Sequence, residues 1–178
     1  MRRILANIAA RFSLLLALTA LLFGSPLHSY AADNSVRVQL YVKKAAPRAV
    51  EDLTESAILR DYRIAWMSMS RALESNSSEF LEGAFAGDAK NLLVQTVTSQ
   101  QQSQLSRRYA DQNHQVEAVF YAPEGDVMEL HDTAQYQLEI VDGDKIIREE
   151  RVTVHYIVLM TPAADRWVVR QLQAVPQF

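Results

Sequence analysis

Residues 115–178 read QVEAVFYAPEGDVMELHDTAQYQLEIVDGDKIIREERVTVHYIVLMTPAADRWVVRQLQAVPQF, and this stretch decides the fold. Along it, apolar and polar side chains alternate in four segments, as they do in a β-strand whose successive residues point to opposite faces of a sheet. The alternation predicts strands over residues 115–122, 126–140, 145–160 and 166–175. Each connecting segment is shorter than a parallel crossover requires, so the pattern predicts an antiparallel meander.

The turn residues and the third segment refine this arrangement. Asp142 and Gly143 separate two of the segments and are typical of a tight hairpin turn, because Asp tolerates and Gly prefers the positive φ that such a turn needs. The later half of segment 145–160 is apolar on both faces. A strand with two apolar faces favours an interior position in the sheet.

The N-terminal residues have the composition of an export signal. Arginines occupy three of the first eleven positions, residues 12–23 form an apolar run, and small residues precede the bond after Ala31. This pattern predicts a secretory signal peptide over residues 1–31 and a periplasmic or secreted protein. The apolar run is shorter than the roughly 20 residues of a spanning helix, so we expect no membrane insertion after cleavage. The alternative is an uncleaved signal that anchors the domain.

Composition limits the classes of partner. The chain has 18 basic residues, 21 acidic residues and no cysteine, so it forms no disulfide. Removal of residues 1–31 takes away three basic residues and no acidic ones, which leaves a net charge of −6. Nucleic acids and anionic membranes are bound mainly through clustered Lys and Arg, so the charge argues against both as partners. The length and the apolar content of 49% suffice for one domain with a core.

Residues 32–52 contain a strand pattern that is separate from the others. Val36, Val38 and Leu40 alternate with polar residues before Pro47 interrupts the run. We interpret residues 32–52 as an N-terminal extended arm, which either adds to an edge of the sheet or binds a strand of a partner.

Three helices are predicted between this arm and the sheet. Asp52 and Glu55 have the spacing of a capping box, in which each side chain satisfies a backbone donor at a helix start. Further patterns predict helices over residues 79–85 and 89–109, and we interpret the uncharged polar run 100–104 as solvent-facing. The first helix carries one apolar stripe with helical spacing, formed by Ile58, Tyr62, Ala65, Trp66, Met69 and Leu73.

Two short motifs and the order of the elements carry a family resemblance. The motifs are Ala-Gly-Asp-Ala at residues 86–89 and Asp-Arg-Trp-Val-Val at residues 165–169. Over residues 53–175 this layout resembles the nuclear transport factor 2-like superfamily, a cystatin-like α+β cone. The resemblance implies a domain over residues 53–178 in which N-terminal helices pack on a curved antiparallel sheet of about four strands. It also implies a cavity at the open end of the cone and frequent dimerisation through the exposed face of the sheet.

The resemblance further implies where catalytic groups would lie. Enzymes of this superfamily use a carboxylate or a His-Asp pair aimed into the cone, often with a tyrosine hydroxyl that stabilises an oxyanion. In this chain the candidates are Tyr62, Glu139 and His155. His155 and Tyr156 are neighbours in one predicted strand and face opposite ways, which argues against an enzyme that uses both.

Other candidates concern ligands and metals. His114 and His131 have no further ligand at metal-binding spacing, and the sequence has no glycine-rich phosphate loop, so we expect neither a metal nor a cofactor. Aromatic side chains on the predicted helices either line a ligand pocket in the cone or belong to the core, and they are Tyr62, Trp66, Phe80 and Phe85.

The sequence favours an exported, non-catalytic binding or scaffolding domain. The chain has a large apolar content but no coherent set of acid and base groups. We expect it to engage a protein partner or a small apolar ligand in the cone, as a homodimer or together with an envelope protein in an envelope assembly. The alternative is a small isomerase or dehydratase with its acid-base residues in the cone.

Overall fold

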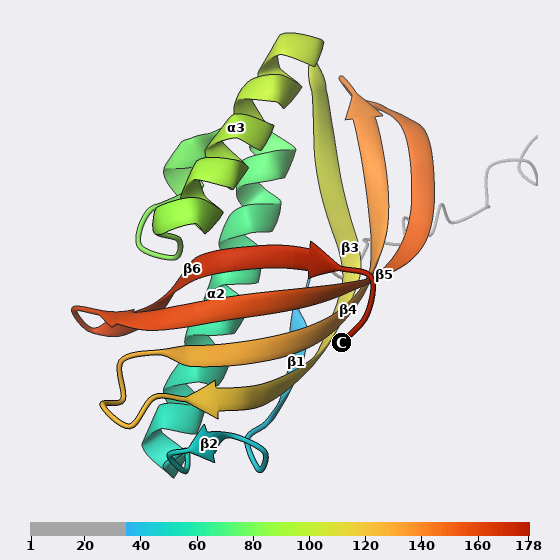
Figure 1. The fold of residues 1–178 in the computed structure, drawn as a ribbon. Helices are drawn as coiled ribbons and strands as arrows, with labels where there is room; N and C mark the ends of the chain where they lie inside the picture. The colour runs from blue at the N-terminus through green and yellow to red at the C-terminus, as the bar shows by residue number, and fades with distance from the viewer. Residues whose placement is uncertain (1–34) are drawn as a thin grey trace, which may run out of the picture. The chain divides into compact units, whose positions relative to one another are not determined.

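The computed structural model describes residues 35–178, which belong to one compact unit over Ala32–Phe178. The predicted signal peptide and its cleavage site lie outside the described residues. None of the helices within residues 35–178 combines the length and the apolar character that crossing a bilayer demands. The elements are shown in Figure 1, and in chain order they are β1 (Arg37–Tyr41), β2 (Ala46–Pro47), α2 (Asp52–Ser75), the 3-10 helix η1 (Ser78–Leu81), α3 (Gly87–Ser103), β3 (Leu105–Tyr121), β4 (Met128–Asp142), β5 (Lys145–Ala163) and β6 (Arg166–Val175).

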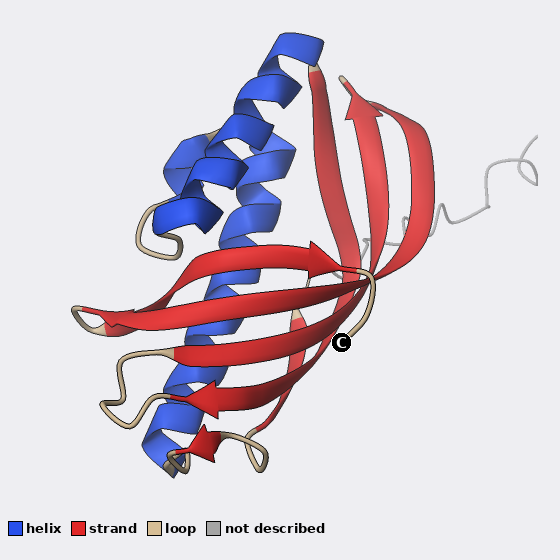
Figure 2. Ribbon diagram, viewed as in Figure 1, coloured by secondary structure: helices blue, strands red, loops and turns tan. Residues whose placement is uncertain are grey.

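The fold is α+β, with α2 and α3 packed on one mixed sheet of six strands. The strand order is β1-β3-β4-β5-β6, and β2 also pairs with β3. Strands β3 to β6 are antiparallel neighbours, which confirms the predicted meander. Strands β1 and β2 run parallel to β3, so the predicted number of about four strands is wrong. Figure 2 shows the helices gathered on one side of the bent strands.

The boundary between α3 and β3 differs from the prediction of a third helix over residues 89–109. Helix α3 ends at Ser103, and Gln104 closes it in the left-handed conformation with φ 56°. Strand β3 then begins at Leu105, ten residues before the predicted start of the first strand. Leu105 and Tyr109 are four residues apart, a spacing that puts them on one face of a helix and equally on one face of a strand. Their spacing therefore did not distinguish the two structures.

The first two helices also differ in detail from the predictions. Glu51 occupies the N-cap position of α2 without a side-chain hydrogen bond, so the predicted capping box is wrong. Asp52 and Glu55 lie in the first turn, where negative charge is favoured by the helix dipole. The helix predicted over residues 79–85 is reduced to the single 3-10 turn of η1.

The apolar stripe of α2 forms the centre of the core, as predicted. The sheet contributes Val116 of β3, Leu130 of β4 and Val158 of β5, each with no exposed surface. The helical side of this core contains all six predicted residues, which are Ile58, Tyr62, Ala65, Trp66, Met69 and Leu73.

A buried carboxylate connects α2 to the last strand. Asp61 Oδ2 accepts a hydrogen bond from the backbone N–H of Trp167 at 2.8 Å, and Arg60 Nε donates to Asp61 Oδ1 at 2.7 Å. Because Trp167 lies near the start of β6, this bond fixes the C-terminal strand on the first long helix.

Strand β1 shows what the predicted arm does within the described residues. It pairs with β3 in a parallel register that runs from Arg37 opposite Asn113 to Tyr41 opposite Glu117. The strand pattern of the arm therefore belongs to the sheet and lies at its edge.

Candidate functional site

The interior of the domain contains a polar cluster of three side chains, Tyr62, His114 and Asp132, here named the buried triad. The Tyr62 hydroxyl of α2 donates to Asp132 Oδ2 of β4 at 2.7 Å. His114 Nδ1 of β3 lies 2.8 Å from the same oxygen. The relative exposure of Asp132 and His114 is 0%, and that of Tyr62 is 1%. The buried triad therefore joins the first helix to the two central strands without contact with solvent.

Burial sets the chemical state of the tyrosine in this cluster. Loss of hydration, followed by the neighbouring Asp132 carboxylate, raises the pKa of the Tyr62 hydroxyl well above its ordinary value. The hydroxyl therefore stays protonated at neutral pH and acts as the donor to Asp132. Among the described residues, no hydrogen-bond partner is found for Asp132 Oδ1 or His114 Nε2.

An aromatic wall encloses the buried triad. The rings of Trp66 and His114 have centroids 4.2 Å apart, and the hydroxyls of Tyr136 and Tyr156 lie 3.1 Å apart. Burial raises the pKa of Tyr136 and Tyr156 and raises the pKa of Tyr109 to about 12, so these hydroxyls also remain protonated at neutral pH. The unpartnered nitrogen of His114 is thus enclosed by packed side chains.

The four aromatic residues predicted from the sequence as ligand contacts lie in or against the core. Tyr62, Trp66 and Phe85 are at most 5% exposed. Phe80 is half-buried, and the guanidinium of Arg71 lies 4.1 Å from the centroid of its ring. None of the four presents an open ring face to a ligand in this conformation.

The three candidates for acid-base catalysis are not brought together. Tyr62 meets the face of the sheet that is covered by helices, whereas Glu139 and His155 point to the opposite face by the alternation of β4 and β5. Arg108 donates to Glu139 at 3.1 Å, and the Thr133 hydroxyl lies 3.1 Å from His155 Nδ1. Glu139 is 6% exposed and its partner Arg108 also donates to Glu74 of α2, so both candidates are engaged by neighbouring side chains.

Two members of the buried triad, Asp132 and His114, were not predicted from the sequence. Asp132 lies between Leu130 and Ala134 on the face of β4 that otherwise carries apolar residues. A carboxylate at such a position could have indicated a buried polar site. His114 was missed because the predicted strand began at residue 115.

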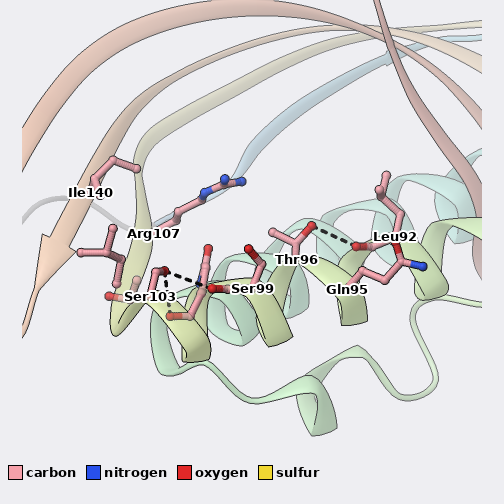
Figure 3. A pocket seen from close by; sticks show the side chains of 10 residues that line it. Leu92, Gln95, Thr96, Ser99, Ser103, Arg107 and Ile140 are labelled. Carbon is pink, nitrogen blue, oxygen red and sulfur yellow. Dashed lines mark hydrogen bonds between the residues drawn. The ribbon is translucent and has the colours of Figure 1, made fainter.

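The surface carries a groove along one side of α3. Its first part has a volume of about 340 Å³ and lies between the C-terminal half of α3 and the starting residues of β3 (Figure 3). A second hollow of about 320 Å³ lies between the N-terminal half of α3 and β6. Leu92, which is 52% exposed, lines both hollows. We name the two together the α3 groove.

The α3 groove combines apolar contacts with uncharged hydrogen-bonding groups. The Thr96 hydroxyl donates to Leu92 O at 2.9 Å and the Ser103 hydroxyl donates to Ser99 O at 3.0 Å, so their lone pairs remain to accept bonds from a ligand. The charged lining residues are Arg107 at one end and Asp88 at the other. The remaining residues that line the first hollow are Leu92, Gln95, Ser99, Gln100, Leu105, Ser106 and Ile140.

The groove does not have the composition of a metal site. Within residues 35–178, no three His, Cys, Asp or Glu side chains are grouped so that they could hold a metal ion. Arg107 makes no ion pair with another described residue, although its side chain is within hydrogen-bonding reach of Tyr109. The α3 groove therefore offers a ligand one cation, Arg107, at one end and one carboxylate, Asp88, at the other, with neutral groups between them.

Comparisons with known proteins give a fold but no family. The sequence matches no protein-family model and no curated protein. The structure is similar to a crystal structure of the intermembrane space region of the chloroplast protein ARC6, with a TM-score of 0.56 and 13% sequence identity. The match covers 72% of this chain and 98% of that one. At this identity the likeness shows that the two chains share an α+β fold.

Proposed function

We propose that this protein is an exported, non-catalytic binding domain that engages a protein partner through the α3 groove and serves as an accessory part of an envelope assembly. The observation that carries the proposal is the groove itself. Its two hollows lie along α3 between Asp88 and Ser103. This helix has 17 residues and is roughly 25 Å long at 1.5 Å per residue, which matches the length of a short extended peptide segment. The groove contains leucine side chains together with amide and hydroxyl groups. These can bind an extended peptide, whose backbone forms hydrogen bonds and whose side chains alternate in direction.

The filled interior supports binding at the surface. Trp66 and Tyr62 occupy the space in which a cone-shaped domain would hold a small apolar ligand, and both are almost fully buried. A ligand in that position would have to displace core side chains, whereas the α3 groove is open in the present conformation. We therefore favour a protein partner over a small apolar ligand.

Two further points support a place in an envelope. The N-terminal sequence predicts export, and the similar region of ARC6 is an intermembrane space region. We propose that this protein likewise lies in an envelope compartment. The assignment to the nuclear transport factor 2-like superfamily likewise belongs to the proposal, and it rests on the order of the elements and the two short motifs.

A peptide selection tests the proposed binding site. Peptides selected from a random displayed library on the exported protein are expected to contain a carboxylate that pairs with Arg107. Arg107→Ala should weaken their binding roughly ten- to a hundredfold, because a hydrogen bond to a charged group contributes roughly 1.5–3 kcal/mol. Binding is measured by titration calorimetry on each purified variant.

Two further variants make this selection decisive. Thr96→Trp fills the groove and should abolish binding. Arg151→Ala is the matched control, since this exposed arginine lies on β5 and pairs with Asp111 away from the groove, and it should leave the affinity unchanged. Selected peptides that bind the Arg107 and Thr96 variants as well as the parent protein would contradict the proposed site.

A second candidate function has one specific observation in its favour. The buried triad combines a histidine, a carboxylate and a tyrosine hydroxyl, which are the group types that a small isomerase or dehydratase employs. This enzyme would require His114 to meet a substrate. The complete burial of His114 weighs against it in the present conformation.

A further inference from the structure

Strand β1 is an edge strand with one side unpaired. Its inner side pairs with β3, and no described strand pairs with its outer side. Arg37, Gln39 and Tyr41 are exposed, whereas Val38 is buried against the core. An edge of this kind presents backbone donors and acceptors to another strand.

Two hollows follow this strand on the side of α2. A hollow of about 590 Å³ lies at the beginning of β1 and is lined by Arg63 and Met67 of α2. A hollow of about 450 Å³ lies at the end of β1 and is lined by Glu55 of α2. Glu55 and Arg63 form no ion pair with another residue of the described chain, and Met67 is 53% exposed. Arg63 and Glu55 of α2 thus leave opposite charges beside the two ends of the strand. Lys43 and the ion pair of Lys44 with Glu117 also line the second hollow.

We infer that the occupant of this edge is the β1 strand of a second copy of the chain, antiparallel and related by a two-fold axis at Gln39. In this register Gln39 lies opposite Gln39 of the second copy, and Val38 lies opposite Leu40. Arg37 lies opposite Tyr41, which permits a cation-π contact across the strands. Every pair is therefore chemically compatible, as a self-complementary interface requires.

The charges on α2 support the same antiparallel arrangement. A two-fold axis at Gln39 places the beginning of one β1 beside the end of the other. Arg63 of one copy then approaches Glu55 of the second copy, and the symmetric contact is formed as well. The exposed Met67 lies in the same contact. Complementary charge of this kind fixes the register of an interface.

The lysines after β1 do not oppose this pairing. Lys43 lies directly opposite Ser35 of the second copy and has Arg37 as its diagonal neighbour, so no like charges are directly opposed. The interface differs from the dimer through the exposed sheet face that the family resemblance implies, because it joins the two sheets edge to edge. It is independent of the α3 groove, which lies on the other helix.

Cysteine cross-linking tests this interface cleanly, because the chain contains no native cysteine. In the proposed dimer the two copies of residue 39 have Cα atoms about 4.5–5.5 Å apart, within the roughly 4.4–6.8 Å that a disulfide requires. The exported Gln39→Cys variant should therefore form a covalent dimer under mild oxidation. The product is measured by non-reducing electrophoresis and mass spectrometry.

Two matched controls separate this contact from random collision. Gln115 is exposed on β3 and is the residue that pairs with Gln39. In the proposed dimer the two copies of residue 115 would be three strand spacings apart, about 14 Å. Gln115→Cys should therefore not cross-link. Arg37→Cys should not cross-link with itself, whereas the double variant Arg37→Cys, Tyr41→Cys should. Gln39→Cys that cross-links no faster than Gln115→Cys would overturn the inference.

A charge exchange tests the register without cysteine chemistry. Arg63→Glu and Glu55→Arg should each raise the dimer dissociation constant about tenfold, measured by sedimentation over a concentration series. The double exchange should restore the parent value, since the pairs are then reversed. Failure of the double exchange to restore association, with circular dichroism unchanged, would contradict the antiparallel register.

Discussion

Replacement of Asp132 by alanine is expected to lower the free energy of unfolding by about 3–5 kcal/mol, the range for removal of one partner from a buried pair. The carboxylate is completely buried and accepts from Tyr62 at 2.7 Å while His114 Nδ1 lies 2.8 Å from the same oxygen. Its removal leaves both of these groups without a partner in a region that water does not reach. The loss is measured by urea denaturation followed by circular dichroism.

Two comparison variants identify the cause of that loss. Asp132→Asn retains an oxygen that can accept from Tyr62, so it should destabilise the fold less than alanine does. Glu124→Ala removes an exposed carboxylate in the loop between β3 and β4 and should change the unfolding free energy by about 0.5 kcal/mol or less. A loss at Asp132 as small as that at Glu124 would show that the buried triad does not hold the sheet to α2.

Replacement of Trp66 by alanine is expected to lower the free energy of unfolding by about 3–5 kcal/mol as well, the range for truncation of a buried aromatic side chain. The indole is 2% exposed, and its ring contacts connect α2 with all three long strands. Far-UV circular dichroism in urea measures the change. The rings that it contacts are those of Tyr62, His114, Tyr136 and Tyr156.

An exposed residue of the same helix supplies the control for Trp66. Leu53 is 87% exposed in the first turn of α2, and Leu53→Ala should have an effect of about 0.5 kcal/mol or less. A ligand-binding tryptophan in an open pocket would resemble Leu53 in this measurement. Equal small losses at both positions would therefore contradict the description of Trp66 as core.

The sheet could be predicted because its strands follow the simplest periodic rule. β6 spans Arg166–Val175 as the alternation predicts, and β5 begins at the predicted Lys145. The later half of β5 is apolar on both faces because it lies between β4 and β6, whereas its earlier half has β4 alone as a neighbour. The start of β3 could not be placed, since its apolar residues recur every four positions.

The sites were harder to predict because they join residues that are distant in sequence. Tyr62 and Asp132 are 70 positions apart, and nothing local indicates that they form a hydrogen bond. The α3 groove depends on how the start of β3 turns beside α3, and the polar run at residues 100–104 alone suggested only a solvated helix face. Likewise, the pattern of β1 predicted a strand but not its parallel partner.

The central claim is that the interior of this domain is a sealed core and that binding occurs at its surface. Modification of histidines by diethyl pyrocarbonate, followed by mass spectrometry of the folded protein, tests it most directly. We expect the partly exposed His131 and His155 to react and His114 to stay unmodified until the protein is unfolded. Modification of His114 in the folded protein at the rate of His155 would contradict the claim and favour an active site built on the buried triad.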